Sequence, residues 1–412
     1  MWTISCGKMI CLLLILGWLV SSVSCTKEDP KGQDTEQGGG TPDGPDEDKT
    51  PPDQADGGLP AAYFTSPSKI KAKVPSTEIM DQLIACIDGT TKGAVIYVNI
   101  YEFDYLPVSL ALKSAYERGV QLKVMIDSSK ASSREGNKQT LQMFRALLQA
   151  PSELISINNH SWPNAINHHK DVLFSKVNLE GKQYEHVVFV TSHNFTAAQM
   201  KVTQDAVILS DKGLYEACID NWNKMRALSH EGMKDFEFNT YAAPGGKRTA
   251  FFYPKRHNGA WDGSYLVMDL LDEQLRDLSH DTIMIMMSRW SDGQLAIVDK
   301  LEALQKKGAH IEIITRYEGG SGLGEELTRK LKDLDAADFE VLFLPKPYIV
   351  HSKYMLIKGV WNGQPHTIIM NGSLNWTNPS TQHNNNLVLF LVDSPLFSPY
   401  EHNFRQVRKT FQ

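Results

Sequence analysis

The fold of this chain can be inferred from Val350-His351-Ser352-Lys353-Tyr354-Met355-Leu356-Ile357-Lys358, which is followed by Asn371-Gly372-Ser373-Leu374-Asn375. A similar pattern occurs earlier, as His168-His169-Lys170 and then Ser192-His193-Asn194. Each copy has His-x-Lys, an apolar run, a turn, a second apolar run and Ser-x-Asn. The serine follows the histidine by 24 residues in the earlier copy and by 22 in the later one. Two such matches in one chain indicate a duplicated unit.

The sequence around the two motifs repeats as well. Helical periodicity places Ile79, Met80, Leu83, Ile84 and Ile87 on one face, and it does the same for Leu266, Leu270, Leu271 and Leu275. In each copy a β-rich run follows, then a helix that ends at glycine, then a second strand. These segments are 94–100, Gly119 and 121–126 in the first copy, and 282–287, Gly308 and 310–314 in the second.

Strands that alternate with helices predict an α/β protein with two lobes related by a pseudo-twofold axis. Each lobe is expected to be a mixed, mostly parallel sheet flanked by helices. The pattern breaks between residues 230 and 248, so we place the lobes at 61–238 and 239–412. A pseudo-twofold axis would bring His168 and His351 to one central cleft.

The N-terminal residues 1–25 resemble a secretory signal peptide. An apolar run over residues 9–23 follows Lys8, and it is shorter than the about 20 apolar residues that cross a bilayer. The ending Ser22-Val23-Ser24-Cys25 is similar to a bacterial lipoprotein cleavage site, although Ser22 replaces the usual branched aliphatic residue. Cleavage by another peptidase or an uncleaved anchor are the alternatives. In each case we expect an exported protein, either secreted or lipid-anchored through Cys25.

Residues 26–60 are rich in Gly, Pro, Asp and Gln, and they carry a net charge of −7. Such a segment cannot bury enough apolar surface to offset its ordering entropy, so it predicts a disordered linker. Because the whole chain has a net charge of −6 and residues 1–25 contribute +1, residues 61–412 are neutral. A neutral body exerts no general attraction on nucleic acid.

Two cysteines, Cys86 and Cys218, lie in the predicted folded body. They can form one disulfide bond or remain as two buried thiols. Two cysteines are too few to build a cysteine-ligated metal site.

The His-x-Lys motifs suggest phosphoryl chemistry. Strand alternation places His168 with Lys170, and His351 with Lys353, on one face. One imidazole can attack phosphorus while the other protonates the leaving oxygen. The phosphoryl charge would be held by the two lysines and by the residues of the Ser-x-Asn motifs. These residues are Ser192, Asn194, Ser373 and Asn375, and the chemistry calls for no metal and no other cofactor.

These motifs resemble the duplicated HxK(x)4D and GSxN motifs of the phospholipase D superfamily, and the repeat covers residues 61–412 in the same way. The later copy is a close match, whereas the earlier copy has Thr191 in place of the motif glycine. Both copies depart from the family at the motif aspartate, where Ser175 and Lys358 stand.

The resemblance also implies an acidic residue about eleven positions beyond each motif asparagine, which orients a histidine of the other lobe. The counted positions hold Asp205 and Asn386. A carboxylate favours imidazolium, while an amide oxygen only fixes the neutral tautomer. We therefore expect His351, paired with Asp205, to be the proton donor, and His168, paired with Asn386, to be the neutral nucleophile.

The resemblance implies a phosphodiesterase that hydrolyses phospholipid headgroups to phosphatidic acid through a phosphohistidine intermediate. The expected partners are a phospholipid or other phosphodiester and a membrane surface, and the protein is expected to be a monomer. One alternative is a metal-independent nuclease or a cardiolipin hydrolase of the same superfamily. The other is a non-catalytic descendant that binds anionic lipid or phosphate.

Overall fold

The computed structural model describes residues 59–129, 135–159, 162, 165–261, 267, 271, 281–361 and 364–412, all within one compact unit. The predicted signal peptide 1–25 and nearly all of the predicted linker 26–60 lie outside these residues, as do Leu266, Leu270 and Leu275 of the predicted helix. Within the described residues, no helix has both the length and the apolar character that a membrane span requires.

The first sheet has seven strands in the order β1-β7-β6-β5-β2-β3-β4. The strands are β1 (Ala61–Phe64), β2 (Val95–Ile100), β3 (Gln121–Asp127), β4 (Glu153–Ile157), β5 (Lys170–Leu179), β6 (Lys182–Thr191) and β7 (Asp205–Ser210). The helices around it are α1 (Pro67–Lys71), α2 (Glu78–Asp88), α3 (Leu106–Glu117), α4 (Glu135–Leu147), the 3-10 turn η3 (Ala197–Lys201) and α5 (Lys212–Leu228).

The second sheet has eight strands in the order β14-β13-β12-β15-β16-β17-β9-β8. These are β8 (Asn239–Ala242), β9 (Arg248–Tyr253), β12 (Thr282–Met287), β13 (His310–Thr315), β14 (Phe339–Phe343), β15 (Lys353–Trp361), β16 (Gln364–Gly372) and β17 (Asn386–Val392). A small sheet pairs β10 (Arg256–His257) with β11 (Ala260–Trp261). The helices are η4 (Asp292–Gln294), α7 (Leu295–Gln305), α8 (Glu325–Leu334), α9 (Asn378–Gln382) and α10 (Phe397–Phe411).

The two sheets repeat one topology, which confirms the predicted two-lobed α/β fold. Read from its far edge, the first sheet runs β4-β3-β2-β5-β6-β7-β1, and the second runs β14-β13-β12-β15-β16-β17-β9 in the corresponding order. Corresponding helices of the two lobes also end in the same way. For example, α3 and α7 are each followed by a glycine with positive φ, Gly119 at 91° and Gly308 at 110°, a conformation that costs glycine little.

The expectation that the sheets are mostly parallel was wrong. The parallel pairings are β2 with β3, β3 with β4, β12 with β13 and β13 with β14, and the other pairings of both sheets are antiparallel. The His-x-Lys run and the next apolar run form a hairpin in each lobe. In β5 and β6 its turn is Glu180-Gly181, both with positive φ, which suits a tight antiparallel hairpin.

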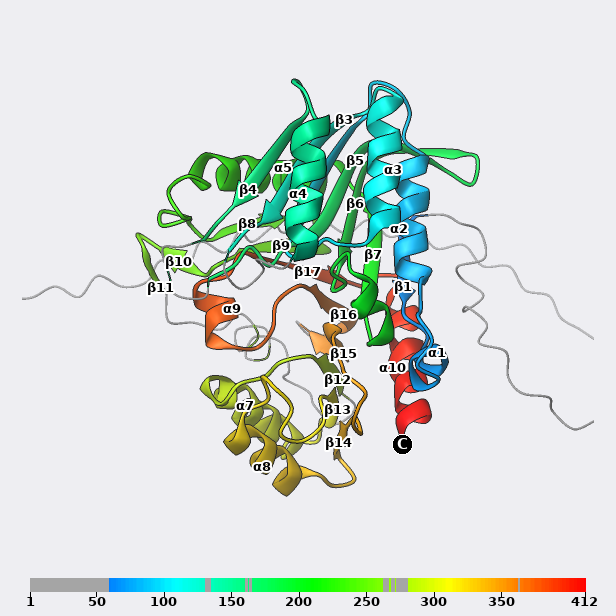
Figure 1. The fold of residues 1–412 in the computed structure, drawn as a ribbon. Helices are drawn as coiled ribbons and strands as arrows, with labels where there is room; N and C mark the ends of the chain where they lie inside the picture. The colour runs from blue at the N-terminus through cyan, green and yellow to red at the C-terminus, as the bar shows by residue number, and fades with distance from the viewer. Residues whose placement is uncertain are drawn as a thin grey trace, which may run out of the picture. The chain divides into compact units, whose positions relative to one another are not determined.

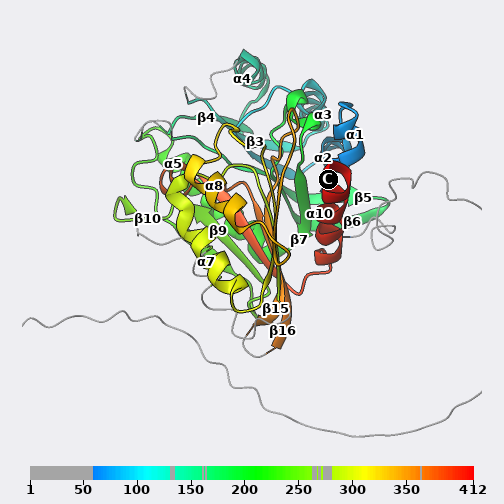
Figure 2. The ribbon, with the colours of Figure 1, turned by 90° about the horizontal axis from the view of Figure 1, so that it is seen from below.

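Apolar residues form three layers of core. The faces of α2, α3 and α4 pack on the outer side of the first sheet, and α7 and α8 pack on the outer side of the second. The third layer lies between the sheets and includes residues of α5 and α10. Figure 1 shows α2, α3 and α4 side by side over the first sheet, and Figure 2 shows α7 and α8 on the side of β15 and β16 opposite α10. The two lobes therefore share a core.

The predicted face of α2 is confirmed: Ile79, Met80, Leu83 and Ile87 are buried, and Ile84 is half-buried. Burial of a side chain of this size contributes about 1.5–3 kcal/mol. Cys86 on the same helix and Cys218 on α5 are both buried free thiols, so of the two possibilities left open they form no disulfide.

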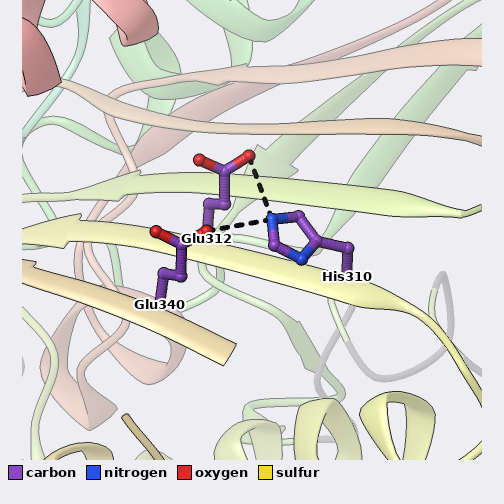
Figure 3. A group of neighbouring side chains, drawn as sticks. All are labelled: His310, Glu312 and Glu340. Carbon is purple, nitrogen blue, oxygen red and sulfur yellow. Dashed lines mark ion pairs between the residues drawn. The ribbon is translucent and has the colours of Figure 1, made fainter. Parts of the chain in front are cut away.

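Charged side chains fix α10 to the second sheet. Glu312 of β13 is only 2% exposed, and its Oε2 contacts both Arg405 and Arg408. Arg408 also contacts Glu340 of β14. His310 Nε2 lies 3.6 Å from Glu312 Oε1 and 3.3 Å from Glu340 Oε1, as Figure 3 shows. The two guanidinium groups balance the two carboxylates, so we interpret this cluster as a structural ion-pair network.

Candidate active site

Each motif histidine is held by backbone hydrogen bonds to the other lobe. His168 N donates to Asn385 O at 2.8 Å, and His351 N donates to Thr203 O at 3.1 Å. Both contacts extend short parallel bridges, Asn167 with Asn385 and Thr203 with Val350. The residues that lead into β5 and β15 therefore run along the opposite lobe, as the predicted pseudo-twofold axis requires.

An amide oxygen of the second lobe orients the His168 ring. Nδ1 of His168 lies 2.8 Å from Asn386 Oδ1, which confirms the expected pairing. Asn386 Nδ2 donates to Ser380 O at 3.0 Å, and Ser373 Oγ donates to Asn386 Oδ1 at 3.1 Å. With its amide fixed this way, Asn386 accepts from Nδ1–H of the histidine. Nε2 then carries a free lone pair.

The His351 ring has a corresponding amide partner from the first lobe, but it is Gln204. Nδ1 of His351 lies 3.0 Å from Gln204 Oε1. Gln204 Nε2 donates to Gln199 Oε1 at 2.6 Å, so the amide oxygen faces the histidine. Gln199 Nε2 lies 3.5 Å from His351 Nε2. The expectation that Asp205 pairs directly with His351 was wrong.

The two lobes differ in the length of one loop, and this difference explains why Gln204, and not Asp205, faces His351. Ser192 N donates to Asp205 O, whereas the corresponding Ser373 N donates to Leu387 O. Asp205 is thus the structural counterpart of Leu387, and Gln204 is the counterpart of Asn386. Because the first-lobe loop is one residue shorter, counting the same number of positions in both lobes selects the wrong side chain.

Asp205 instead supports the site from behind. It is fully buried and accepts hydrogen bonds from Ser192 Oγ at 2.8 Å and from Tyr400 OH of α10 at 3.0 Å. Ser192 Oγ also lies 2.9 Å from Gln204 Oε1, so its single proton goes to one of the two acceptors at a time. Burial raises the pKa of Asp205, and the hydrogen bonds from Ser192 and Tyr400 oppose that change.

The two motif lysines are buried beside the histidines. Lys170 Nζ donates to His168 O at 2.9 Å, and Lys353 Nζ contacts His351 O and lies 3.2 Å from His351 Nδ1. Burial lowers the pKa of Lys170 to about 7, although Glu102, Asp127 and Asp171 act in the opposite direction. Burial and the nearby charge of Lys170 lower the pKa of Lys353 well below its usual value. These lowered pKa values favour the binding of an anion. The negative charge of an anion would raise the pKa of both lysines and so restore their positive charge.

The same environment keeps both histidines neutral. Burial lowers the pKa of His168 well below its usual value, and the charges of Lys170 and Lys353 add to this effect. Burial lowers the pKa of His351 well below its usual value too, and the charges of Lys353 and Lys170 add to this effect. Each ring is therefore close enough to the groups of the other lobe to respond to their charge.

The motif asparagines, Asn194 and Asn375, are buried, and their Oδ1 atoms have no hydrogen-bond partner among the described residues. Asn194 Nδ2 lies 3.4 Å from Glu102 Oε2. Ser175 and Lys358, which stand where the family has its motif aspartates, do not contact this site. Ser175 Oγ accepts from Val95 N at 2.8 Å within the sheet, and Lys358 is exposed on β15.

Two further side chains of the first lobe lie near the rings. Tyr101 has its ring centre 5.4 Å from that of His168 and 5.4 Å from Lys170 Nζ. His169 points away from the site, because its Nδ1 lies 2.6 Å from Asp171 Oδ1. The predicted alternation of His168 and His169 is therefore confirmed. All of the predicted pairs, His-x-Lys and Ser-x-Asn from both lobes, lie at the ends of β5, β6, β15 and β16 nearest the lobe interface.

A comparison with known families identifies this arrangement. The model described as "Cardiolipin synthase, PLD-like domain" matches residues 83–225 and again residues 274–408. The chain belongs to the phospholipase D-like family. Members of this family act on the phosphodiester bonds of phospholipids or nucleic acids. The two matched segments correspond to the two lobes, and each contains one His-x-Lys and one Ser-x-Asn motif.

Two solved structures agree on the fold of this phospholipase D-like chain, and a third is similar over a smaller part of it. Phosphatidylserine synthase from Haemophilus influenzae Rd KW20 is similar with a TM-score of 0.56 at 12% identity, over 85% of this chain and 86% of that one. Polyphosphate kinase from Porphyromonas gingivalis gives 0.52 at 10% identity over 86% of this chain, which spans 50% of that kinase. NUC from Salmonella typhimurium, a phospholipase D family member, gives 0.31 at 21% identity, over 41% of this chain and 95% of NUC. No curated protein matches the chain.

Proposed function

We propose that this protein is a phospholipase D-type enzyme that transfers the phosphatidyl group of a phospholipid to water. The main support is the matched setting of the two rings: each has its Nδ1 held by an amide oxygen, Asn386 for His168 and Gln204 for His351. The Nε2 atom of His168 is then free for chemistry at a phosphorus atom between the lobes, whereas Nε2 of His351 lies 3.5 Å from Gln199 Nε2, which a substrate oxygen would replace. Two buried lysines provide positive charge at that place.

His168 is the nucleophile in this proposal. Its Nε2 lone pair attacks phosphorus while the bond from phosphorus to the headgroup oxygen breaks, and that oxygen takes the Nε2 proton of protonated His351. Neutral His351 then removes a proton from water. The water oxygen attacks phosphorus and breaks the phosphorus–nitrogen bond, which releases phosphatidic acid and regenerates His168. An alcohol in place of water would give transphosphatidylation.

His351 has to gain a proton before the first step, because burial and neighbouring cations keep it neutral in the free enzyme. The negative charge of a bound phosphodiester favours imidazolium and raises the pKa of the ring. Lys170 and Lys353, with the amide groups of Asn194 and Asn375, stabilise the charge that develops on the phosphoryl oxygens. No residue in this sequence of steps needs a metal ion.

The location of the enzyme is part of the proposal. The signal-like residues 1–25 and the acidic residues 26–60 support an exported enzyme that is secreted or attached to a membrane through lipidated Cys25. Such an anchor would keep the phospholipid substrate within reach of the folded body, which is expected to act as a monomer.

The test uses the purified protein in the presence of a chelator. It is incubated with labelled phosphatidylcholine, cardiolipin and single-stranded DNA, side by side with His168→Asn and with the control His366→Asn. His366 pairs with Asp393 near the surface of the second lobe. We expect lipid turnover by the wild type and by H366N, loss of turnover in H168N, and an acid-labile phosphoryl label on His168. Cleavage of DNA alone, or a label on His351, would contradict the proposal.

A further inference from the structure

Two arginines of the second lobe end their strands beside the active site. Arg289 is the second residue after the end of β12, and Arg316 directly follows β13. The last residue of β12, Met287, pairs with Lys353 on one side and with Thr315 on the other. Trp376 N donates to Arg289 O at 3.0 Å, next to Asn375. Arg289 and Arg316 thus lie at the same sheet edge as the second-lobe motif residues.

Both guanidinium groups contact Ser321 in the loop after β13. Arg289 Nη2 donates to Ser321 Oγ at 3.2 Å, and Arg316 Nη1 donates to Ser321 O at 3.0 Å. Nε of Arg316 is buried and has no hydrogen-bond partner among the described residues. The carboxylate of the same loop, Glu318, pairs with Lys332 at 3.0 Å instead. Two like charges are therefore held together, and in the described structure neither forms an ion pair.

The charges of these arginines reach the groups that would hold the phosphodiester. Arg289 lowers the pKa of His168 and of Lys353, and Arg316 lowers the pKa of His351 and of Lys353. Burial and the neighbouring charge of Arg289 lower the pKa of Arg316 to about 10. An anion bound between the two guanidinium groups would relieve this mutual repulsion.

The first lobe carries the opposite charge at the corresponding positions. Ile100 pairs with Lys170 and with Ile126, just as Met287 pairs with Lys353 and with Thr315. By this register Arg289 corresponds to Glu102, and Arg316 corresponds to Asp127. Both of these acids are buried. The pseudo-twofold relation thus holds for the motif residues but not for these strand ends, so of these two pairs of positions the second-lobe pair can bind an anion and the first-lobe pair cannot.

We infer that Arg289 and Arg316 bind a second phosphate of the substrate, next to the phosphodiester that is cleaved. This rests on the proposed function, and it narrows the substrate to a phospholipid whose headgroup carries another phosphate. Arginine suits this task because its planar fork binds two phosphate oxygens at once. A polynucleotide would be held by a long row of cations, whereas residues 61–412 are neutral overall and this feature is a single pair. The observations therefore favour a lipid.

The first test measures binding without catalysis. The purified wild type, R289Q/R316Q and the control R329Q are titrated with orthophosphate and with pyrophosphate by calorimetry, in chelator and at one ionic strength. Arg329 lies on α8 and pairs with Asp333 at the surface. We expect the wild type and R329Q to bind pyrophosphate about tenfold more tightly than orthophosphate, a ratio that the double variant loses. Equal binding of both anions by the wild type, or a preference retained by the double variant, would overturn the inference.

The second test measures turnover of cardiolipin, which carries a second phosphate in its headgroup, and of phosphatidylcholine, which does not. R289Q/R316Q changes the charge around the catalytic groups for both lipids alike, so the measured quantity is the ratio of the two effects at one fixed pH. We expect the double variant to raise KM about tenfold more for cardiolipin than for phosphatidylcholine. The single variant R289Q, whose side chain is exposed, gives a smaller change in the same direction without a risk to folding. An equal loss on both lipids, or a rise in KM for a single-stranded oligonucleotide only, would contradict the assignment.

The two tests separate this inference from the proposed function. Lipid turnover that depends on His168, together with a pyrophosphate preference that does not depend on the arginines, would leave the proposed function standing and remove the second phosphate site. An arginine-dependent pyrophosphate preference without turnover of any lipid would support the anion site and contradict the proposed lipid enzyme.

Discussion

The residues that distinguish this site chemically are Gln204 and Asn386. The amide oxygen of each lies within hydrogen-bond distance of Nδ1 of a histidine in the other lobe, and neither amide carries a charge. A carboxylate at the same place would stabilise imidazolium by a hydrogen bond about twice as strong. The amide partners, together with burial and the nearby lysines, therefore set both rings to the neutral form in the free enzyme.

The pH profile of the variant Gln204→Glu tests whether the amide partner helps to keep His351 neutral. The new carboxylate raises the pKa of His351, the residue that must be protonated to release the headgroup. We expect the alkaline limb of kcat/KM to move up by about one pH unit or more, measured from initial rates on a phospholipid. Wild-type kcat/KM should rise as the pH falls below 7, because the pKa of His351 is lowered.

The matched variant Asn386→Asp should shift the other limb of the pH profile of kcat/KM. It raises the pKa of His168, which must be unprotonated to attack, so the acid limb should move up and the alkaline limb should stay in place. If Gln204→Glu moves the acid limb instead, the roles of the two histidines are reversed.

The buried positive charge of Lys170 lowers the stability of the folded protein. Burial lowers its pKa from 10.5 to about 7 in the folded protein, so between these values the unfolded chain binds more protons than the folded one. Wild-type stability should therefore rise with pH across this window. Lys170→Met removes the buried cation, and because one unit of pKa shift corresponds to about 1.4 kcal/mol, we expect it to stabilise the protein by about 1–4 kcal/mol below pH 7 while activity is lost.

The advantage of the methionine variant should shrink as the pH rises from 7 toward 10.5, as measured by urea unfolding across that range. Lys212→Met, at a lysine whose side chain is 68% exposed, serves as the control and should show no such trend. A lower unfolding midpoint for Lys170→Met at every pH would show that Lys170 stabilises the fold.

At the scale of whole elements, α10 connects the second sheet to the support of the active site. Tyr400 in its first turns donates to Asp205, and Asn371 Nδ2 donates to Tyr400 OH at 3.0 Å. Arg405 and Arg408, in its last turns, contact buried Glu312. The position of α10 therefore affects both the stability of the second lobe and the network behind Gln204.

Glu312→Gln should weaken the attachment of α10. The change leaves the partly buried Arg408 with a neutral partner at that oxygen, and we expect a loss of about 1–3 kcal/mol in the free energy of unfolding. Urea unfolding measures the loss. Asp333→Asn, at an exposed pair with Arg329, is the control and should cost less than about 1 kcal/mol. Equal effects of the two substitutions would mean that the buried network contributes no more than a surface pair.

The order of helices and strands could be predicted from the sequence because it depends on local periodicity and on repeated spacing. The faces of α2 and the glycines after α3 and α7 are examples. Strand direction could not be predicted in the same way. The turn Glu180-Gly181 permits a hairpin, but the identity of the neighbouring strands is decided by contacts between distant segments.

The motif residues of the candidate site could be predicted from the sequence, but the residues that contact them could not all be predicted. His168, Lys170, His351 and Lys353 come together because strand alternation and the duplication place them. Gln204 was missed because a loop that is one residue shorter changes the side chain that faces the other lobe, and spacing alone does not reveal it. Alignment of Ser192 with Ser373 and of the following strands, instead of a fixed count, would have found it.

At the scale of the whole molecule, the two lobes form one site and share one core. Core residues of both sheets, such as Leu173 and Val188 of the first and Met284 and Leu356 of the second, belong to a single buried cluster. Separation of the lobes would expose this cluster to water. Each histidine also depends on an amide of the other lobe, so the site needs both lobes in register.

This arrangement predicts that inactive variants cannot rescue one another. In a mixture of purified His168→Asn and His351→Asn proteins, one intact site would form only if chains exchanged lobes. We expect no recovery of phosphodiesterase activity after mixing, incubation and assay on the substrate that the wild type turns over, because exchange would require the shared core to open. The control is the same mixture after joint unfolding in urea and refolding, which should still be inactive if each chain pairs its own lobes. Recovery of activity in either mixture would show that a lobe of one chain pairs with a lobe of another, and that the enzyme works as an exchanged dimer.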